Sequence, residues 1–329
     1  MPKPPPIAAI LYVVSSIVHP AIALDCAKAT APQEKAICST PEALVTDEAM
    51  AKAYQALYAS LAEPDKKTLL LSQRAWLKLR TNLCPEEASA AAALCLKQKT
   101  EERRTYLEGR PDAGPGSGGR LAPVLIQQPG RKGSYEIDVT ALKYAAPSSP
   151  GEMLFNSEVD RLLKDVPTGK QSDVEHDRIY SFDLHLRITY ASPHLISAHV
   201  ETYQFTGGAH GNSGANNINV DVGKAKILGF ADVFPKAAEP KLDSECMRQI
   251  LAQKAEKMPD MKISGEDEKQ LRSAVAEGVG KLDRWSFSPG KAEVGYDPYE
   301  LGAYVEGSYS CTFTKEFLRS LAKREFALP

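Results

Sequence analysis

The chain has 329 residues, which is enough for two domains. With 43% hydrophobic and 25% charged residues, its composition is that of a globular protein and excludes collagen-like, disordered and membrane-bundle chains. The formal net charge of −2 lacks the basic excess with which proteins hold nucleic acid. We therefore predict a folded protein without a nucleic-acid partner.

The first 23 residues differ from the rest of the chain. Lys3 gives a weakly basic start, residues 7–18 form an apolar run, and Ala21 and Ala23 supply the small side chains that a signal peptidase needs. We interpret 1–23 as a cleaved secretory signal, which places the mature protein in the periplasm or outside the cell. A retained membrane anchor is the alternative, although the run is shorter than the ~20 apolar residues of a spanning helix.

Six cysteines form an even set, and in an exported chain such a set predicts disulfides. Four lie in the first half and two, Cys246 and Cys311, in the second, so each half can pair its own. A zinc site would need closely spaced cysteine pairs, and the sequence has none. We predict neither a metal nor another cofactor.

Helical periodicity governs the first half of the chain. One apolar stripe lies within residues 41–62, and a second follows the break at 63–65 and ends near Cys84. The stripes consist of Met50, Tyr54, Leu57 and Leu61, then of Leu69, Trp76, Leu79 and Leu83. A third helix is expected over 86–107. We expect the first two helices to fold back as a hairpin.

The hairpin bears on the four early cysteines. It would bring Cys38, before the first helix, close to Cys84, after the second, and would leave Cys26 to pair with Cys95. Four cysteines allow three connectivities, so the sequence leaves the alternatives open.

Glycine and proline dominate residues 109–123, where no apolar period survives. This composition predicts a flexible linker between domains at 24–108 and 124–329.

Beyond the linker the period changes to alternation, which is typical of strands. Apolar side chains occupy every second place over 180–190, and shorter patterns occur at 135–142, 195–205, 218–222 and 309–313. Two helical stripes, Leu242, Cys246 and Ile250, then Leu271, Val275 and Leu282, precede the last strand, and a short helix begins at Lys315. The fold class is therefore a small disulfide-linked all-α domain followed by an α+β domain with an antiparallel sheet and helices. Cys246 and Cys311 would link a helix to that sheet.

Two segments of the second half are candidate partner-binding sites. A glycine-rich loop follows the strand that ends at Phe205, and it can turn tightly and expose a histidine. A tyrosine-rich segment lies near residue 300, and tyrosines bring a large rigid contact area. The candidate residues are Thr206, Gly207, Gly208, His210, Gly211, Asp297 and Tyr299. The alternatives are a purely conformational hairpin turn and core packing of the tyrosines.

No catalytic pattern stands out. The segment Gly211-Asn212-Ser213-Gly214 is not a G-x-S-x-G nucleophile elbow, and His185, His194 and His199 lack metal-ligand spacing. We expect a protein that is not an enzyme.

The first half resembles the LprI-like family of small exported domains, named for a lysozyme inhibitor. The resemblance rests on DCAKA at 25–29, EKAIC at 34–38 and QRAWL at 73–77, together with Arg80, Cys84, Cys95, Leu96, Arg103 and Arg104. It implies a disulfide-linked helical domain, with inhibition of lysozyme as one role in the family.

The second half resembles the domain shared by the anti-sigma factor RsiV, a lysozyme receptor, and the non-catalytic part of the peptidoglycan deacetylase PdaC. The resemblance rests on YQFTGGAHGN at 203–212, on 228–234 with Asp232, and on DPYELGAYVEG at 297–307. Deacetylation and sigma-factor binding do not carry over, because the chain lacks the segments that perform them.

Both resemblances imply the same partner. We therefore expect an exported cell-envelope protein that binds, and in one version inhibits, lysozyme or a related muramidase. The alternative is an accessory module that binds peptidoglycan or another envelope protein and inhibits nothing.

Overall fold

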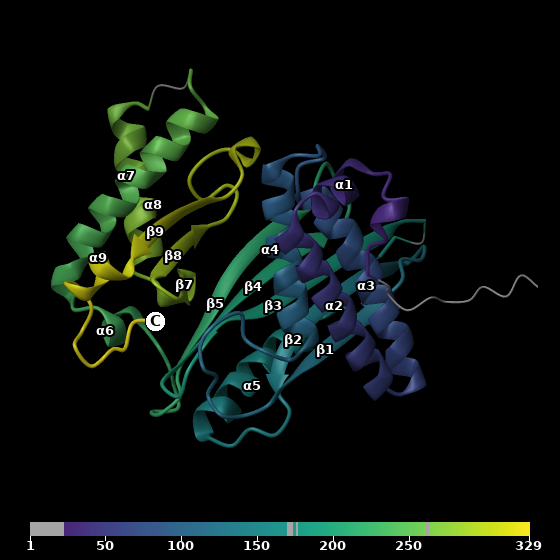
Figure 1. Cartoon of the computed structure of the whole chain (residues 1–329). Coiled ribbons are helices and arrows are strands. Elements are labelled where there is room, and N and C mark those ends of the chain that lie inside the picture. The colour runs from purple at the N-terminus through teal and green to yellow at the C-terminus, as the bar shows by residue number, and fades with distance from the viewer. Residues whose placement is uncertain (1–22, 170–173, 176, 261–262) are drawn as a thin grey trace, which may run out of the picture.

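The computed structural model describes residues 23–169, 174–175, 177–260 and 263–329. Four N-terminal helices lie beside a six-stranded sheet, and a three-stranded sheet with further helices follows at the C-terminal end (Figure 1). The predicted signal, 1–23, lies outside the described residues except for Ala23. Within the described ranges, no helix combines the length and the apolar character needed to cross a membrane.

The predicted all-α first domain is confirmed. Its helices are α1 Pro32–Cys38, α2 Pro41–Ser60, α3 Glu63–Leu83 and α4 Ala90–Leu107. Prolines in the first turns of α2 and α3 set the start of each helix, because a first-turn proline loses no helical hydrogen bond. Helix α2 packs mainly against α4, and Tyr54 and Tyr106 share one core. Helices α2 and α3 contact each other as the predicted hairpin requires, because Asp47 pairs with Arg80 at 3.2 Å and Gln73 donates to Met50 Sδ at 3.3 Å. Helix α3 also lies against strand β1, Leu121–Gln128.

The two N-terminal disulfides differ from the predicted pairs. Cys26 is bonded to Cys38 and Cys84 to Cys95, in place of Cys38 with Cys84 and Cys26 with Cys95. Gln33 of α1 donates to the Cys84 carbonyl, so the two ends do meet as the hairpin argument required. Each cysteine nevertheless pairs with the one nearest in sequence, at separations of 12 and 11 residues.

The large sheet has the strand order β1-β2-β3-β4-β5-β6. Its remaining elements are β2 Ser134–Tyr144, α5 Pro150–Lys164, β3 Ile179–Ala191, β4 Leu195–Phe205, β5 Asn212–Asp221 and β6 Lys226–Ile227. Strands β2 and β3 are parallel, with Tyr135 opposite Tyr180, whereas the other neighbours are antiparallel. The sheet is therefore mixed and not purely antiparallel. The crossover through helix α5 returns the chain to the end of the sheet at which β2 begins, so β3 runs parallel to β2.

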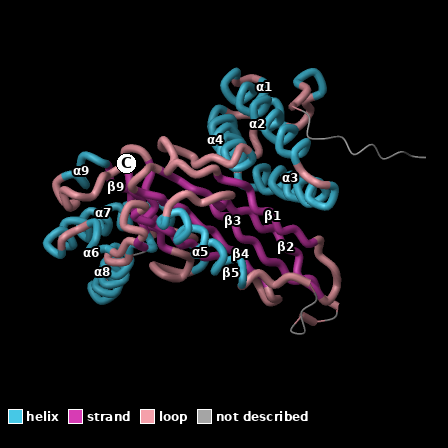
Figure 2. The backbone as a smooth tube through the Cα atoms, turned by 90° about the horizontal axis from the view of Figure 1, so that it is seen from below, coloured by secondary structure: helices cyan, strands magenta, loops and turns pink. Residues whose placement is uncertain are grey.

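The two faces of this sheet have different covers. Val139 and Leu184 share a core with Phe155 of α5. Side chains alternate along a strand, so the intervening polar positions, such as His185 and Arg187, face the other way. Helices α3 and α4 lie over part of this polar face (Figure 2).

The C-terminal layer joins helices to a second sheet of order β7-β8-β9. Its elements are α6 Phe230–Val233, α7 Glu239–Lys257, α8 Gly265–Val279, β7 Trp285–Ser288, β8 Lys291–Tyr296, β9 Tyr309–Thr314 and α9 Lys315–Arg319. Trp285 is fully buried and stacks on Phe313 with a centroid distance of 5.1 Å. The predicted disulfide between Cys246 of α7 and Cys311 of β9 is confirmed.

The glycine-rich segment, predicted as a linker over 109–123, is held against the sheet. Strand β1 begins at Leu121, inside that range. The Gly116 amide donates to the Ala191 carbonyl at 3.0 Å, and the Ala191 amide donates to the Ala113 carbonyl at 3.0 Å. The connection between the helical domain and the sheet therefore has fixed contacts with the end of β3.

Candidate functional site

The predicted glycine-rich loop joins β4 to β5. Gly207 and Gly208 have φ values of +91° and +102°, a region that residues with a Cβ rarely adopt. Thr206 and Gly208 are exposed at the loop. Gly211 is buried, and a Cβ there would come within 2.5 Å of the Tyr203 ring, so its role is to allow close packing.

His210 contacts the second predicted segment. Its ring stacks on Tyr304 with a centroid distance of 3.9 Å and an interplanar angle of 13°. Nδ1 lies 2.9 Å from the Gly211 carbonyl, so it carries the proton that it donates there. Nε2 then accepts from the Tyr299 hydroxyl at 3.2 Å. We call His210, Tyr299 and Tyr304 the aromatic surface.

Tyr299 is the most conspicuous member of this surface. Its side chain is 60% exposed, and its φ of +74° is a strained value for a residue with a Cβ. Val305, next to Tyr304, is 82% exposed. An aromatic, strained and solvent-facing group is the kind of feature that protein interfaces use as an anchor.

Asp297 holds the segment that carries Tyr299 in place through hydrogen bonds. Its carboxylate accepts from the Ala215 amide at 2.9 Å and from Arg284 Nη1 at 3.1 Å. These bonds join β5 and the turn before β7 to the tyrosine segment. Asp297 was predicted as a partner contact, and the structure places it among intramolecular partners.

A buried ion pair fixes the segment that carries Tyr304. Lys254 Nζ of α7 lies 2.6 Å from Glu306 Oε2, and both side chains are 5% exposed. Burial opposes ionisation of Glu306, but hydrogen bonds from Lys254 and Tyr309 outweigh it and hold the pKa of Glu306 below its usual value. The buried ion pair therefore fixes the position of the segment that carries part of the aromatic surface.

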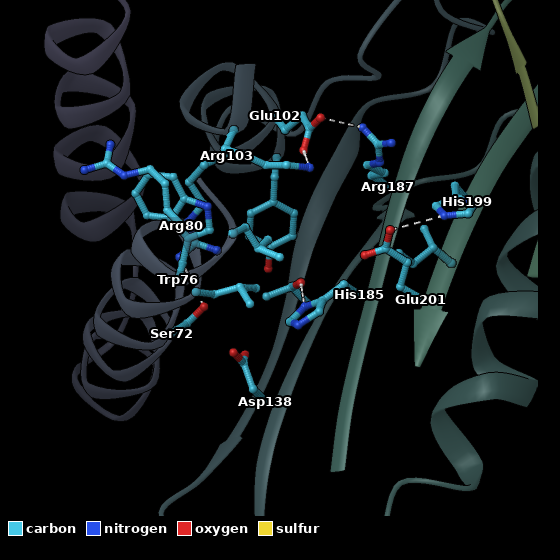
Figure 3. A pocket seen from close by; sticks show the side chains of 16 residues that line it. Ser72, Trp76, Arg80, Glu102, Arg103, Asp138, His185, Arg187, His199 and Glu201 are labelled. Carbon is cyan, nitrogen blue, oxygen red and sulfur yellow. Dashed lines mark hydrogen bonds and ion pairs between the residues drawn. The ribbon is translucent and has the colours of Figure 1, made fainter. Parts of the chain in front are cut away.

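Sequence patterning missed a cavity between the helical domain and the polar face of the large sheet (Figure 3). Its volume is about 110 Å³, and it is partly open to solvent. We call it the interdomain cavity. Its lining includes Trp76, Leu79, Arg80 and Leu83 of α3, Lys99, Glu102, Arg103 and Tyr106 of α4, and Asp138, Thr140, His185, Arg187, His199 and Glu201 of the sheet.

The helical wall combines apolar and cationic groups. The guanidinium carbons of Arg80 and Arg103 lie 4.8 and 5.7 Å from the Trp76 ring centroid. Arg103 is 4% exposed and donates to Gln73 Oε1 and Ser72 Oγ at 3.0 and 3.1 Å. Desolvation lowers the pKa of Arg103.

The sheet wall is a grid of polar groups on adjacent strands. His185 Nδ1 lies 2.8 Å from Thr140 Oγ1, and Arg187 Nη1 lies 3.0 Å from Glu102 Oε1 across the cavity (Figure 3). His199 Nε2 lies 3.3 Å from Glu201 Oε1, and this interaction lowers the pKa of Glu201. Within the described part of the chain, no cluster of three or more His, Cys, Asp or Glu residues fits a metal ion.

The cavity was missed because its two walls come from different domains. From the sequence, Trp76 was predicted only as part of an apolar helical stripe, and Arg80 was named only among the residues that carry the family resemblance. The available signal was the matching polar positions on three strands, since Thr140, His185 and Glu201 stand in register.

Comparisons with known proteins place the two halves separately. Residues 26–107 match the family model described as lysozyme inhibitor LprI, and residues 134–213 match the model described as deacetylase PdaC. The peptidoglycan-N-acetylmuramic acid deacetylase PdaC of Bacillus subtilis is 20% identical over 209 residues. That alignment covers 63% of this chain but only 43% of the relative.

Two solved structures are similar to about two thirds of the chain. A DUF3298 family protein from Pseudomonas aeruginosa has 18% identity and a TM-score of 0.44, and the match covers 64% of this chain and 97% of that one. A DUF3298 family member from Bacteroides fragilis has 10% identity and a TM-score of 0.41, with 63% and 95% covered.

The N-terminal resemblance is thus confirmed on the helices and cysteines described above, and the C-terminal one on β2 to β4 and the loop that follows β4. The chain joins an LprI-type domain to a PdaC-type domain.

Proposed function

We propose that this protein is an exported envelope protein that binds lysozyme and inhibits it, without catalytic activity of its own. The observation that carries the proposal is the LprI match over 26–107, which spans the four helices and both N-terminal disulfides. The disulfides support an oxidising location such as the periplasm or the cell exterior.

The aromatic surface is the contact that we propose for lysozyme. It combines an exposed aromatic ring, a hydrogen-bonding histidine and a rigid support, which together lower the entropy lost on binding. A slight excess of acidic residues in the second domain would help to attract a cationic partner.

Lysis of a cell-wall suspension by lysozyme tests this function. The mature protein should slow the clearing of turbidity and should co-elute with lysozyme on gel filtration. Tyr299→Ala should weaken both effects, whereas Met153→Ala, at a position of α5 that is 55% exposed and lies outside the aromatic surface, serves as the control that retains them. Full inhibition by Tyr299→Ala would move the contact elsewhere, and the absence of both inhibition and complex would reject the function.

Peptidoglycan binding without inhibition is the second candidate, and the PdaC match is the observation that favours it. Retention on insoluble cell wall without lysozyme would support it. Release of muropeptides by the protein alone would contradict the proposed lack of catalysis.

A further inference from the structure

One cation of the interdomain cavity, Arg103, forms no ion pair within 4 Å with a carboxylate of the described residues, and Asp138 of the sheet wall acts on it only at longer range. Among the other cations of its lining, Arg80 pairs with Asp47 at 3.2 Å, Lys99 with Glu102 at 2.9 Å, and Arg187 with Glu102. Arg103 forms no ion pair with any described carboxylate, and its hydrogen-bond partners are neutral. A buried charge without a counterion is costly, so an anion inside the cavity would be strongly favoured next to it.

A second donor on the same wall is also unsatisfied. Nε of Arg80 is buried and has no hydrogen-bond partner. Arg80 and Arg103 both lie against Trp76, so the uncompensated charge and the unused donor belong to one small region. Buried donors are normally satisfied, and a small movement of the Arg80 side chain on binding would let a ligand oxygen accept from this one.

The sheet wall of the cavity presents hydrogen-bond acceptors, which favour a donor group on the ligand. The pKa of Glu201 is lowered to about 2, so its carboxyl group is ionised at neutral pH, and its side chain is 62% exposed. One of its oxygens has no partner among the described residues; the same holds for one oxygen of Asp138 and for Nε2 of His185. Water can satisfy these groups in the free protein, and a ligand that displaces this water needs hydroxyl donors on this side, because carboxylate oxygens only accept hydrogen bonds. A ligand with acidic groups alone would be repelled here.

The remaining lining is apolar. Leu79, Leu83 and the Trp76 edge offer contact to a carbon skeleton. Binding pockets at domain interfaces combine such a wall with a few placed polar groups. The volume of about 110 Å³ limits the enclosed part of the ligand to a small molecule or to one arm of a larger one.

We propose that the interdomain cavity binds a small hydroxy acid, with its carboxylate beside Arg103 and Arg80 and its hydroxyls toward Glu201 and His185 (Figure 3). The acid is either a free sugar acid or the acid arm of a cell-wall sugar, because both present the same chemistry. This site is separate from the aromatic surface and does not depend on lysozyme binding.

Isothermal titration of the disulfide-bonded protein tests the site. The ligands are D-glucuronate and N-acetylmuramate, with D-glucose and N-acetylglucosamine as neutral counterparts. An acid should bind at least tenfold more tightly than its neutral counterpart, and the preferred acid identifies the source. Equal binding of acids and neutral sugars, or no binding of either acid, overturns the proposal.

Two variants locate the binding. Arg103→Met should weaken the acid at least tenfold. Arg104→Met is the matched control, because Arg104 is the next residue of α4 but pairs with Glu101 and lies outside the cavity lining. If Arg103→Met does not fold, Glu201→Ala carries the test and should weaken binding several-fold. Unchanged affinity in a folded Arg103→Met protein also overturns the proposal.

Discussion

The surroundings of the Asp183 carboxyl group oppose its ionisation. Burial, with the neighbouring charges of Asp138 and Glu136, raises its pKa to about 7. In the unfolded chain an aspartate titrates near ~3.9. Between these values the native protein holds a proton that the unfolded chain has released, so the free energy of unfolding falls as the pH rises from about 4 to about 7.

Asp183→Asn removes this ionisation. We expect the free energy of unfolding of the variant to be about 2 kcal/mol higher than that of the parent at pH 8, and to equal it at pH 4. Urea unfolding at both values measures it. Glu256→Gln, on an exposed position of α7, is the control and should show no such pH dependence. Equal stability of Asp183→Asn and parent at pH 8 would contradict the prediction.

Substitutions at two glycines of the loop at the aromatic surface should have different effects, one on lysozyme binding and the other on stability. A side chain at Gly208 meets no atom within 4 Å, whereas a Cβ at Gly211 meets the Tyr203 ring. Gly208→Leu should therefore cost only roughly 1 to 2 kcal/mol, from its backbone conformation, but should weaken lysozyme binding at least tenfold. Gly211→Ala should lose stability by about 1 to 3 kcal/mol.

Thermal unfolding and gel filtration with lysozyme measure both effects. If Gly208→Leu bound lysozyme normally, the loop would be a conformational turn only.

Removing one member of the buried pair between Lys254 and Glu306 should strongly destabilise the protein. Glu306→Gln leaves a buried ammonium group without its counterion, and we expect a loss of about 3 to 5 kcal/mol. Urea unfolding measures it. Glu277→Gln breaks the exposed pair with Lys281 and should cost far less, because water screens the interaction between these two side chains. Similar losses in both variants would show that burial does not matter here.

At the scale of elements, the disulfides differ in the length of chain that they close. Cys84 and Cys95 are 11 residues apart, whereas Cys246 and Cys311 are 65 apart. Loop-closure entropy predicts that removing the short bond costs about 3 kcal/mol and the long one about 4 kcal/mol. Double serine variants of each pair, compared by guanidinium unfolding, check the order. A larger loss for the short pair would show that native contacts outweigh chain entropy.

The elements that could be predicted are those with a clear local period. The alternation over 180–190 predicted β3, and the stripe through Cys246 predicted α7. Strand β1 was missed because Pro123 and its glycine-rich approach are typical of a linker. Proline is tolerated there because β1 is an edge strand.

At the scale of the whole molecule, one candidate site could be predicted from the sequence and the other could not. His210 and Tyr299 were both predicted as partner contacts, and the structure brings them together. The polar positions of neighbouring strands match, but the interdomain cavity could not be predicted from them, because no local pattern in either domain indicates that α3 and α4 lie on this part of the sheet. The same placement explains why the polar face of β3 is covered.

Arg187 is a principal link between the two domains. It pairs with Glu102 of α4 at 3.0 Å and with Asp112 of the connecting segment at 3.4 Å. Arg187→Met should loosen the domains by roughly 1 kcal/mol, since the pairs are partly exposed. Limited proteolysis should then cut faster within 109–120, whereas Arg161→Met, which breaks an exposed pair within α5, should not change the rate. Unchanged cleavage in Arg187→Met would assign the link to other contacts.

The nearest-neighbour pairing of the first four cysteines has a consequence for the order of oxidative folding. Bonds across 12 and 11 residues need only local encounters, and short loops close faster and at lower entropic cost than long ones. The N-terminal domain can therefore acquire both covalent links while the rest of the chain is still unfolded. Cys246 must wait until α7 meets β9, so the last bond records the completion of the second domain.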